Sequence, residues 1–137
     1  MGDSAETAEG RGLMSRLGIT ITEATRGRVV GSMPVEGNTQ GHGRLHGGAS
    51  ALLAETLGSM GSAICAGPQR IALGIEINVS HHRAATVGFV TGVATPLHLG
   101  TTLATWEVVI RDEEGKRVCT ARVTCALRAR GQEPETN

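Results

Sequence analysis

One segment of this 137-residue chain limits the possible folds more than any other. Residues 41–63 read GHGRLHGGASALLAETLGSMGSA, a loop that opens into an apolar stretch. Residues 45–66 hold a single carboxylate, Glu55, and no Lys or Arg. The stretch predicts a helix that begins near position 46 or 47. It ends near Gly67, because Gly stops a helix and the Pro that follows cannot continue it.

The composition of this helix indicates what surrounds it. Gly, Ala and Ser dominate it, and three glycines, Gly48, Gly58 and Gly61, lie in its interior. Each costs a helix about 1 kcal/mol relative to Ala. We therefore expect these glycines to permit close packing on more than one side of the helix, as a curved sheet wrapped around it would require.

The rest of the chain has the period-two alternation of strands. The stretch 86–97, for example, alternates through Val87, Phe89, Thr91 and Val93. Such alternation with short links predicts antiparallel strands. The strand stretches are 17–35, with a turn near Arg26 and Gly27; 71–82, with Leu73, Ile75, Ile77 and Val79; 86–97; 101–112, with Trp106, Val108 and Ile110; and 117–130.

Together these elements predict an α+β hotdog fold. About six antiparallel strands form a curved sheet that wraps around one central helix. A chain of this length is predicted to hold one domain, residues 13–130, between disordered polar tails at 1–12 and 131–137.

Composition excludes several classes of protein. Thirteen basic and thirteen acidic residues cancel, and the chain has one Trp, one Phe and no Tyr. Nucleic-acid binders show a basic excess and stacking aromatics, so we expect no nucleic-acid partner. We also expect no membrane-spanning run. Cys65, Cys119 and Cys125 form no CxxC pair, and no secretion signal is visible, so the sequence predicts reduced thiols and a cytoplasmic location.

Glu55 is the candidate catalytic residue. No cation lies at helical spacing from it, since the nearest are Arg44 and Arg70. An unpaired carboxylate facing an interior is costly, so two readings stay open. Either its helix face is exposed to solvent, or the carboxylate lies in a pocket where partial desolvation tunes it as a base or nucleophile.

The start of the helix is a second candidate group. Gly47 and Gly48 occupy its first positions, where backbone N–H groups lack partners and the helix dipole is positive. Such an end either is an ordinary Gly-rich turn or stabilises an oxyanion on a carbonyl. Gly47 and Glu55 are about 12 Å apart along a helix axis, too far for one substrate carbonyl. If both are catalytic, two antiparallel helices from two subunits must share each site.

The sequence also leaves other chemistries to be weighed. His42 and His46 are four residues apart, which allows a metal site, but His42 precedes the predicted helix and HExxH is absent. We therefore expect no metal. The paired Asp and His of hotdog hydratases are not visible. A hotdog module that binds acyl-CoA without catalysis would need the pocket but not Glu55.

The motifs QGHGRLHGGASALLAETLGSMGSA, GIEINVSHHRA and PLHLGTT followed by WEVVIRDEEGKRV resemble those of hotdog-fold acyl-CoA thioesterases. The resemblance covers residues 17–128 and is greatest to the aryl-CoA branch. That branch includes the Arthrobacter-type 4-hydroxybenzoyl-CoA, dihydroxynaphthoyl-CoA and phenylacetate-pathway thioesterases. The resemblance implies that the protein hydrolyses an aromatic acyl-CoA. The alternatives are hydrolysis of a medium-chain fatty acyl-CoA and a binding module without catalysis.

The resemblance assigns roles to five residues. Glu55 matches the catalytic carboxylate, which acts as nucleophile or as general base on water. Gly47 matches the backbone N–H that polarises the thioester carbonyl, and Gln40 a side chain near the thioester. His46 matches a supporting His, and Ser59 a hydroxyl that positions water or the carboxylate.

The same resemblance implies how coenzyme A is bound. No separate cofactor is required, because the coenzyme A moiety is part of the substrate. Members are typically tetramers, built as dimers of dimers. Some relatives carry Arg where this chain has Thr101, which places a charged contact there in doubt. The candidate contacts are His81, His82 and Arg83, the hydroxyls of Thr101 and Thr102, and a charge from Arg128 or Arg130.

Overall fold

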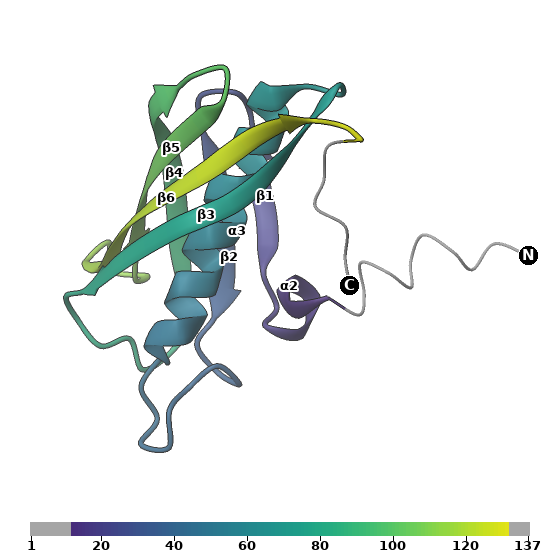
Figure 1. The fold of residues 1–137 in the computed structure, drawn as a ribbon. Coiled ribbons are helices and arrows are strands. Elements are labelled where there is room, and N and C mark those ends of the chain that lie inside the picture. Colours follow the sequence, from purple (N-terminus) through teal and green to yellow (C-terminus); the bar gives the residue numbers. More distant parts are fainter. Residues whose placement is uncertain (1–11, 132–137) are drawn as a thin grey trace, which may run out of the picture.

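The computed structural model of the protein describes residues 12–131. Apart from their innermost residues, Gly12 and Gly131, the predicted tails lie outside this range. The elements, drawn in Figure 1, are α2 (Leu13–Arg16), β1 (Thr20–Ala24), β2 (Val29–Pro34), α3 (Gly47–Ala66), β3 (Arg70–His81), β4 (Phe89–Leu99), β5 (Leu103–Arg111) and β6 (Arg117–Ala129).

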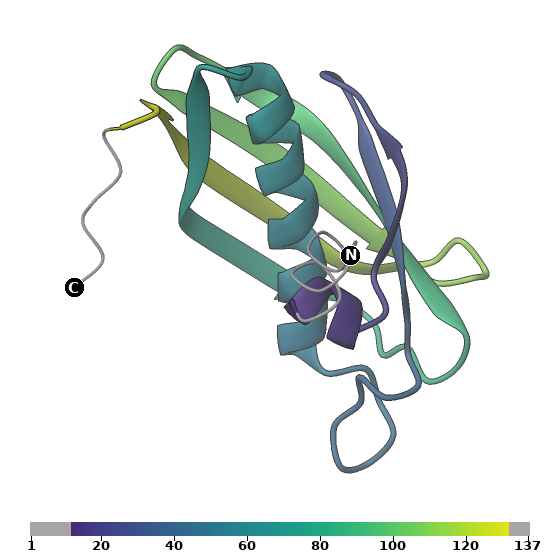
Figure 2. The ribbon, with the colours of Figure 1, turned by 90° about the vertical axis from the view of Figure 1, so that its right-hand side faces the viewer.

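The six strands form one antiparallel sheet in the order β1-β2-β4-β5-β6-β3. The sheet curves around α3, so that the helix lies in its concave face (Figures 1 and 2). This confirms the predicted hotdog architecture. The free edges of the described sheet belong to β1 and to the twelve-residue β3.

Helix α3 begins and ends where the sequence predicts. His46 is the N-cap, and its Nδ1 accepts a hydrogen bond of 2.8 Å from the Gly48 N–H. Gly67 is the C-cap with a φ of 76°, a conformation that favours glycine. The helix is therefore closed at its start by a side chain and at its end by a backbone conformation.

Two glycines let α3 lie close against the sheet. A Cβ at Gly58 would lie 2.8 Å from Val123 of β6, and a Cβ at Gly61 would lie 2.6 Å from the indole of Trp106 on β5. Trp106 and Val123 are fully buried. The expected close packing therefore occurs at both glycines, but on the one face of α3 toward the sheet rather than on more than one side.

One expectation about this helix needs correction. The sequence predicted no run that could span a membrane, yet α3 is long and apolar enough to do so by length and composition alone. Leu53, Ala54 and Leu57 are instead fully buried against the sheet, and about half of the helix is covered. This burial is typical of a core helix, so the apolar composition of α3 is explained by packing against the sheet.

The alternation in β4 predicted the strand but not its inner face. Phe89 is 50% exposed and Val87 lies before the strand, 78% exposed. The residues that face α3 are Val90, Gly92 and Ala94. A Cβ at Gly92 would lie 2.7 Å from Leu57, so small residues are needed there to admit the helix side chains.

Strand β3 contains a second departure from simple alternation. A bulge between Gly74 and Glu76 shifts its register against β6. Ile77 and Val79 pack against the core, but Ile75, at the bulge, is 57% exposed. The bulge changes the direction of the side chains in this part of the edge strand, which lies beside α3.

The short helix α2 was not predicted. Its last turn is closed by a hydrogen bond of 2.9 Å from the Leu17 N–H to the Leu13 carbonyl. The Asn38 side chain donates to the Leu17 carbonyl at 2.8 Å and so ties α2 to the loop before α3. In Figures 1 and 2, α2 lies beside the N-terminal half of α3.

Candidate functional site

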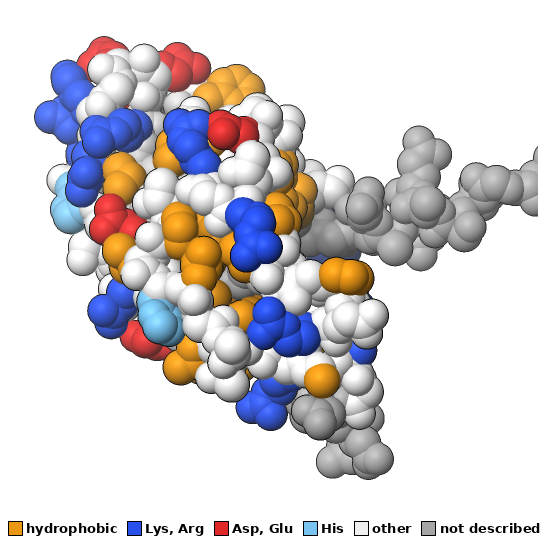
Figure 3. All heavy atoms as spheres, turned by 90° about the horizontal axis from the view of Figure 1, so that it is seen from above, with side chains coloured by type: hydrophobic (Ala, Val, Ile, Leu, Met, Phe, Trp, Pro, Cys, Tyr) orange, Lys and Arg blue, Asp and Glu red, His pale blue; other side chains and the backbone are white. Residues whose placement is uncertain are grey.

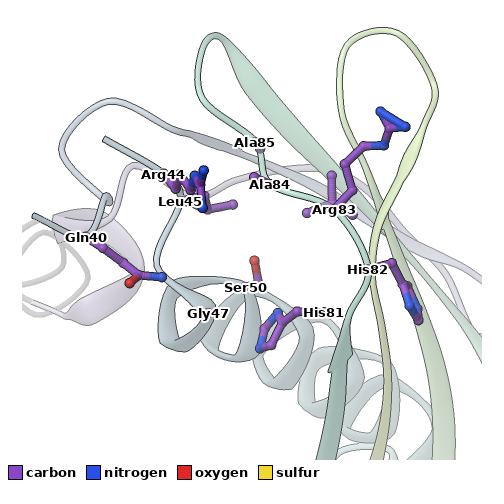
Figure 4. Close-up of a pocket in the computed structure, with 11 residues that line it drawn as sticks. Gln40, Arg44, Leu45, Gly47, Ser50, His81, His82, Arg83, Ala84 and Ala85 are labelled. Atoms are coloured by element: carbon purple, nitrogen blue, oxygen red, sulfur yellow. The ribbon is translucent and has the colours of Figure 1, made fainter. Parts of the chain in front are cut away.

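A pocket of about 350 Å³ opens at the start of α3. Its wall comes from the loop before the helix, the first helical turn and the end of β3 with the segment that follows. Figure 4 shows these side chains around the opening. The pocket brings together five of the predicted site residues, Gln40, Gly47, His81, His82 and Arg83.

Gly47 presents an open hydrogen-bond donor in this pocket. Within residues 12–131 its backbone N–H has no acceptor, whereas the Gly48 N–H is taken by His46. The His81 ring lies so close that a Cβ at Gly47 would be 2.7 Å from its Nε2. Glycine is therefore required here for the ring to approach the helix start, and the free N–H points to an oxyanion site.

Two neighbours complete this part of the pocket. The Gln40 side chain extends toward the helix start, and the Ser50 hydroxyl points into the open space (Figure 4). Ser50 is 1% exposed, and no hydrogen bond to its hydroxyl occurs among the described residues. Together with Gly47 they surround a small volume with groups suited to binding a carbonyl oxygen or a water molecule.

His46 lies outside the pocket wall. Its ring accepts from the Gly48 N–H and sits where a Cβ at Gly48 would be 3.0 Å from Nδ1. The side chain therefore holds the conformation of the first turn. In this structure His46 is the N-cap of α3, and its contact is with the Gly48 backbone.

Glu55 lies two turns further along α3, in a separate hollow of about 620 Å³. In the single chain Glu55 is exposed, and no ion pair with it occurs in the described part of the chain. Ser59 lines the same hollow one turn on. A Cβ at Gly74 of β3 would lie 3.0 Å from Glu55 Oε1 and 4.0 Å from Ser59 Oγ. The strand thus runs directly alongside the carboxylate.

The carboxylate and the open N–H therefore lie in different hollows of one chain. The pocket at Gly47 does not include Glu55, and the hollow at Glu55 does not include Gly47. This agrees with the spacing of about 12 Å along a helix axis. One chain alone does not bring both groups to one carbonyl.

A thiol near the pocket is a possible competing nucleophile. Cys119 pairs with His81 across β6 and β3 and is fully buried. Burial raises the pKa of the Cys119 thiol to about 11. The thiol is therefore protonated at neutral pH and a poor nucleophile.

The candidate contacts for coenzyme A fall at two ends of β3. His81–Arg83 lie at one end, where the His82 ring turns to meet the Thr120 hydroxyl at 2.9 Å and the Arg83 side chain extends outward (Figure 4). Thr102 and Arg128 line a hollow of about 390 Å³ at the other end. Seen from above, the molecule shows basic side chains interspersed with hydrophobic ones (Figure 3).

Thr101 is not part of that hollow. Its carbonyl accepts a hydrogen bond from the Arg70 guanidinium, which fixes the turn between β4 and β5. Arg130 instead donates to the Pro68 carbonyl at 2.8 Å. Of the residues predicted at this end, the structure therefore groups Thr102 with Arg128 alone.

Sequence reasoning missed, among others, Ser50 and Arg44 in the pocket at Gly47 and the close approach of Gly74 to Glu55. Ser50 and Arg44 carried no distinguishing pattern. Gly74 did, because an isolated Gly inside a strand is typical of a bulge or of close backbone approach. Among the described residues, no group of three His, Cys, Asp or Glu side chains is placed to hold a metal ion.

Comparison with known proteins places this geometry in a family. The protein-family model described as Thioesterase superfamily matches residues 42–119 of this chain. The proofreading thioesterase EntH of Cronobacter sakazakii is 47% identical over 116 residues, which cover 84% of this chain and 85% of the relative. The EntH protein of Klebsiella pneumoniae is 44% identical, with the same coverage.

Solved structures agree with this assignment. Thioesterase HI1161 of Haemophilus influenzae superposes with a TM-score of 0.86 at 35% identity, covering 91% of this chain and 88% of that one. A mutant of thioesterase PA1618 of Pseudomonas aeruginosa superposes with a TM-score of 0.85 at 37% identity, and the match covers 88% of each chain.

Proposed function

This chain belongs to the thioesterase superfamily, and we propose that it hydrolyses an aromatic acyl-CoA to the free acid and coenzyme A. That it is a thioesterase follows from its family and its relatives, which disfavours a binding module without catalysis. The observation that carries the mechanism is the open Gly47 N–H in a pocket with Gln40 and His81, eight residues before the carboxylate of Glu55.

The Gly47 N–H polarises the thioester carbonyl. It donates to the carbonyl oxygen, and the partial positive charge of the helix start stabilises the negative charge that develops on that oxygen. Glu55 then acts in one of two ways. It takes a proton from water, whose oxygen attacks the carbonyl carbon, or it attacks directly to give an anhydride that water cleaves. In both cases the C–S bond breaks and coenzyme A leaves as a thiolate, so neither a metal nor a cofactor is needed.

Each site is shared by two chains in this proposal. Strand β3 has a free edge in the described sheet, and it passes Glu55 at Gly74 and the Gly47 pocket at His81. Antiparallel pairing of β3 with its copy, with Gly74 opposite the partner's His81, brings each carboxylate toward the other chain's helix start. A two-fold axis produces two identical sites. A tetramer would be a dimer of such dimers.

The same pairing supports a binding site for the coenzyme A phosphates. Arg128 pairs with Ile71, at the β3 end that would lie near the partner's Arg83. Two guanidinium groups and the Thr102 hydroxyl would then face one region, which suits phosphate. We expect Arg83→Ala and Arg128→Ala each to raise KM for an acyl-CoA about tenfold. They should leave KM for the matching acyl-pantetheine, which lacks the nucleotide, unchanged.

A hydrolysis screen over a panel of acyl-CoAs, read by release of free thiol, tests the activity. We expect benzoyl-, phenylacetyl- or naphthoyl-CoA to give the highest kcat/KM. Preference for octanoyl-CoA would support the medium-chain alternative. Binding of these thioesters without hydrolysis of any would contradict the proposal.

Two variants at one position isolate the oxyanion donor. Gly47→Pro removes the N–H, and Pro suits the first position of a helix. His46 already has φ −67° and ψ 131°, which is compatible with a following Pro. Gly47→Ala keeps the N–H but brings the same Cβ close to His81. We expect Pro to lower kcat about 100-fold below Ala. Equal activity of the two variants would refute the donor.

Mixed dimers test whether the site is shared. A dimer of a Glu55→Ala chain with a Gly47→Pro chain contains one intact site only if the two groups come from different chains. Reassembly from the two inactive variants should therefore restore up to half of the wild-type turnover per dimer. No recovery, with mixed dimers confirmed by mass spectrometry, would refute the shared geometry.

A further inference from the structure

The hollow at Glu55 is apolar everywhere except around the carboxylate. Its wall includes two residues of α2, Leu13 and Met14, and Leu52 and Met60 of α3. Leu13 is 55% exposed, so its side chain is accessible to a ligand in the hollow. The mechanism proposed above uses Glu55 of this hollow but leaves the apolar wall without a role.

The charges of the hollow limit what it can bind. Among residues 12–131, Glu55 is its one charged lining residue, and no Lys, Arg or His of this range lines it. The Thr56 hydroxyl, the other polar group besides Ser59, already donates to the Leu52 carbonyl at 2.7 Å. An acyl group that carries its own carboxylate would meet the repulsion of Glu55 and find no cation among the described residues that line this hollow. The wall fits an uncharged, apolar acyl group.

The position of α2 is fixed although its side chains are accessible. Asn38 donates to the carbonyl of Leu17 directly after α2, and it donates also to the Pro34 carbonyl at 2.8 Å. Asn38 is two residues from Gln40, in the loop that leads to the helix start. The loop that lines the pocket at Gly47 therefore also holds α2, and with it the apolar side chains of Leu13 and Met14, in position.

We propose that α2 forms the outer wall of the acyl subsite, with Leu13 and Met14 setting the size of the acyl group and the hollow excluding acyl groups that bear a carboxylate. This inference rests on the proposed function, because it takes Glu55 to be the carboxylate beside the reacting carbonyl. It adds a specificity determinant from outside the helix and the sheet edge that carry the catalytic groups.

The test compares selectivity in Leu13 variants of the full chain. Leu13→Trp narrows the hollow, so kcat/KM for benzoyl-CoA should fall about tenfold relative to acetyl-CoA. Leu13→Ala should shift the preference toward naphthoyl-CoA. Leu97→Trp is the matched control, because Leu97 is also 55% exposed but lies on β4, away from the hollow; it should leave the ratio unchanged. Wild-type protein should hydrolyse glutaryl-CoA about 100-fold less efficiently than hexanoyl-CoA.

Several results would overturn the inference. One is an unchanged benzoyl-to-acetyl ratio in both Leu13 variants. Another is equal hydrolysis of glutaryl-CoA and hexanoyl-CoA. A third is loss of the dimer on size-exclusion chromatography of Leu13→Trp, which would make α2 an interface between copies. Each leaves the proposed function intact if wild-type protein still hydrolyses acyl-CoA, whereas absence of any hydrolysis would overturn both.

Discussion

The two faces of α3 are built from the same small and apolar residue types but have opposite surroundings. On the face toward the sheet, Leu53, Leu57 and Ser62 are fully buried, and Gly58 and Gly61 contact strand side chains. On the open face, the side chains are only partly buried or exposed, and they line the hollow at Glu55. They are Leu52, Glu55, Thr56, Ser59 and Met60.

The difference shows how one helix separates stability from chemistry. Substitutions on the sheet face meet atoms that have nowhere to move, since protein cores are close-packed. The open face has space, so its residues are free to be chosen for the reaction. Gly58 and Ser59 are neighbours in the chain, yet the first contacts Val123 and the second lies beside Glu55 and Gly74.

The largest expected effect removes the carboxylate of the open face. Glu55→Ala should lower kcat by about 10³-fold or more, because it deletes a principal catalytic group. The melting temperature should stay within a degree or so of wild type, since surface changes have small effects. Steady-state kinetics and thermal unfolding measure the two. Glu55→Gln should keep substrate binding, and near-normal turnover of the Ala variant would contradict the assignment.

The sheet face should give the reverse result. Gly61→Ala introduces a Cβ 2.6 Å from the fully buried Trp106, so overpacking should outweigh the gain in helix propensity. We expect the free energy of unfolding to fall by about 1–3 kcal/mol in urea titration. The kcat of the folded protein should change little. Gly27→Ala, where a Cβ meets nothing within 4 Å, is the control. Equal stability of the two variants would show that the contact with Trp106 is not constraining.

Gly74→Ala tests the boundary between the faces from the side of the sheet. Its Cβ would lie 3.0 Å from Glu55 Oε1, and that exposed carboxylate can shift to relieve the contact. Stability should therefore hold, while displacement of the reacting oxygen should lower kcat about tenfold. Kinetics together with the unfolding midpoint decide this. A loss of stability with kcat unchanged would mean that Gly74 serves the strand bulge alone.

The same contrast explains which features the sequence predicts. Local patterns predict the two ends of α3 and the need for glycine at positions 58 and 61, and the structure confirms both. They also predict that alternate residues of β5 are buried, as Trp106, Val108 and Ile110 are. Local patterns are enough to predict these features because each depends only on contacts between α3 and the strands packed against it.

The inner face of β4 could not be predicted in this way. Counting apolar residues favours Phe89 and Val93, whereas Gly92 faces the helix because Leu57 occupies the space a side chain would need. The approach of Gly74 to Glu55 and the placement of α2 by Asn38 likewise join segments distant in sequence. Gln40 and His81 were expected from a family resemblance, and Gly47 already from its place at the helix start. The structure brings them to one pocket, but their roles stay predictions.

The smallest expected effect concerns His46, where a structural and a chemical role predict different rescues. As an N-cap, its Nδ1 accepts the Gly48 N–H, so His46→Ala should lower the free energy of unfolding by about 1 kcal/mol and kcat by less than tenfold. Asn is among the best N-cap residues, so His46→Asn should restore both stability and turnover. His42→Ala, on the exposed loop, is the control. If the imidazole itself took part in the reaction, Asn would restore stability but not kcat, because an amide neither gives nor takes a proton near neutral pH.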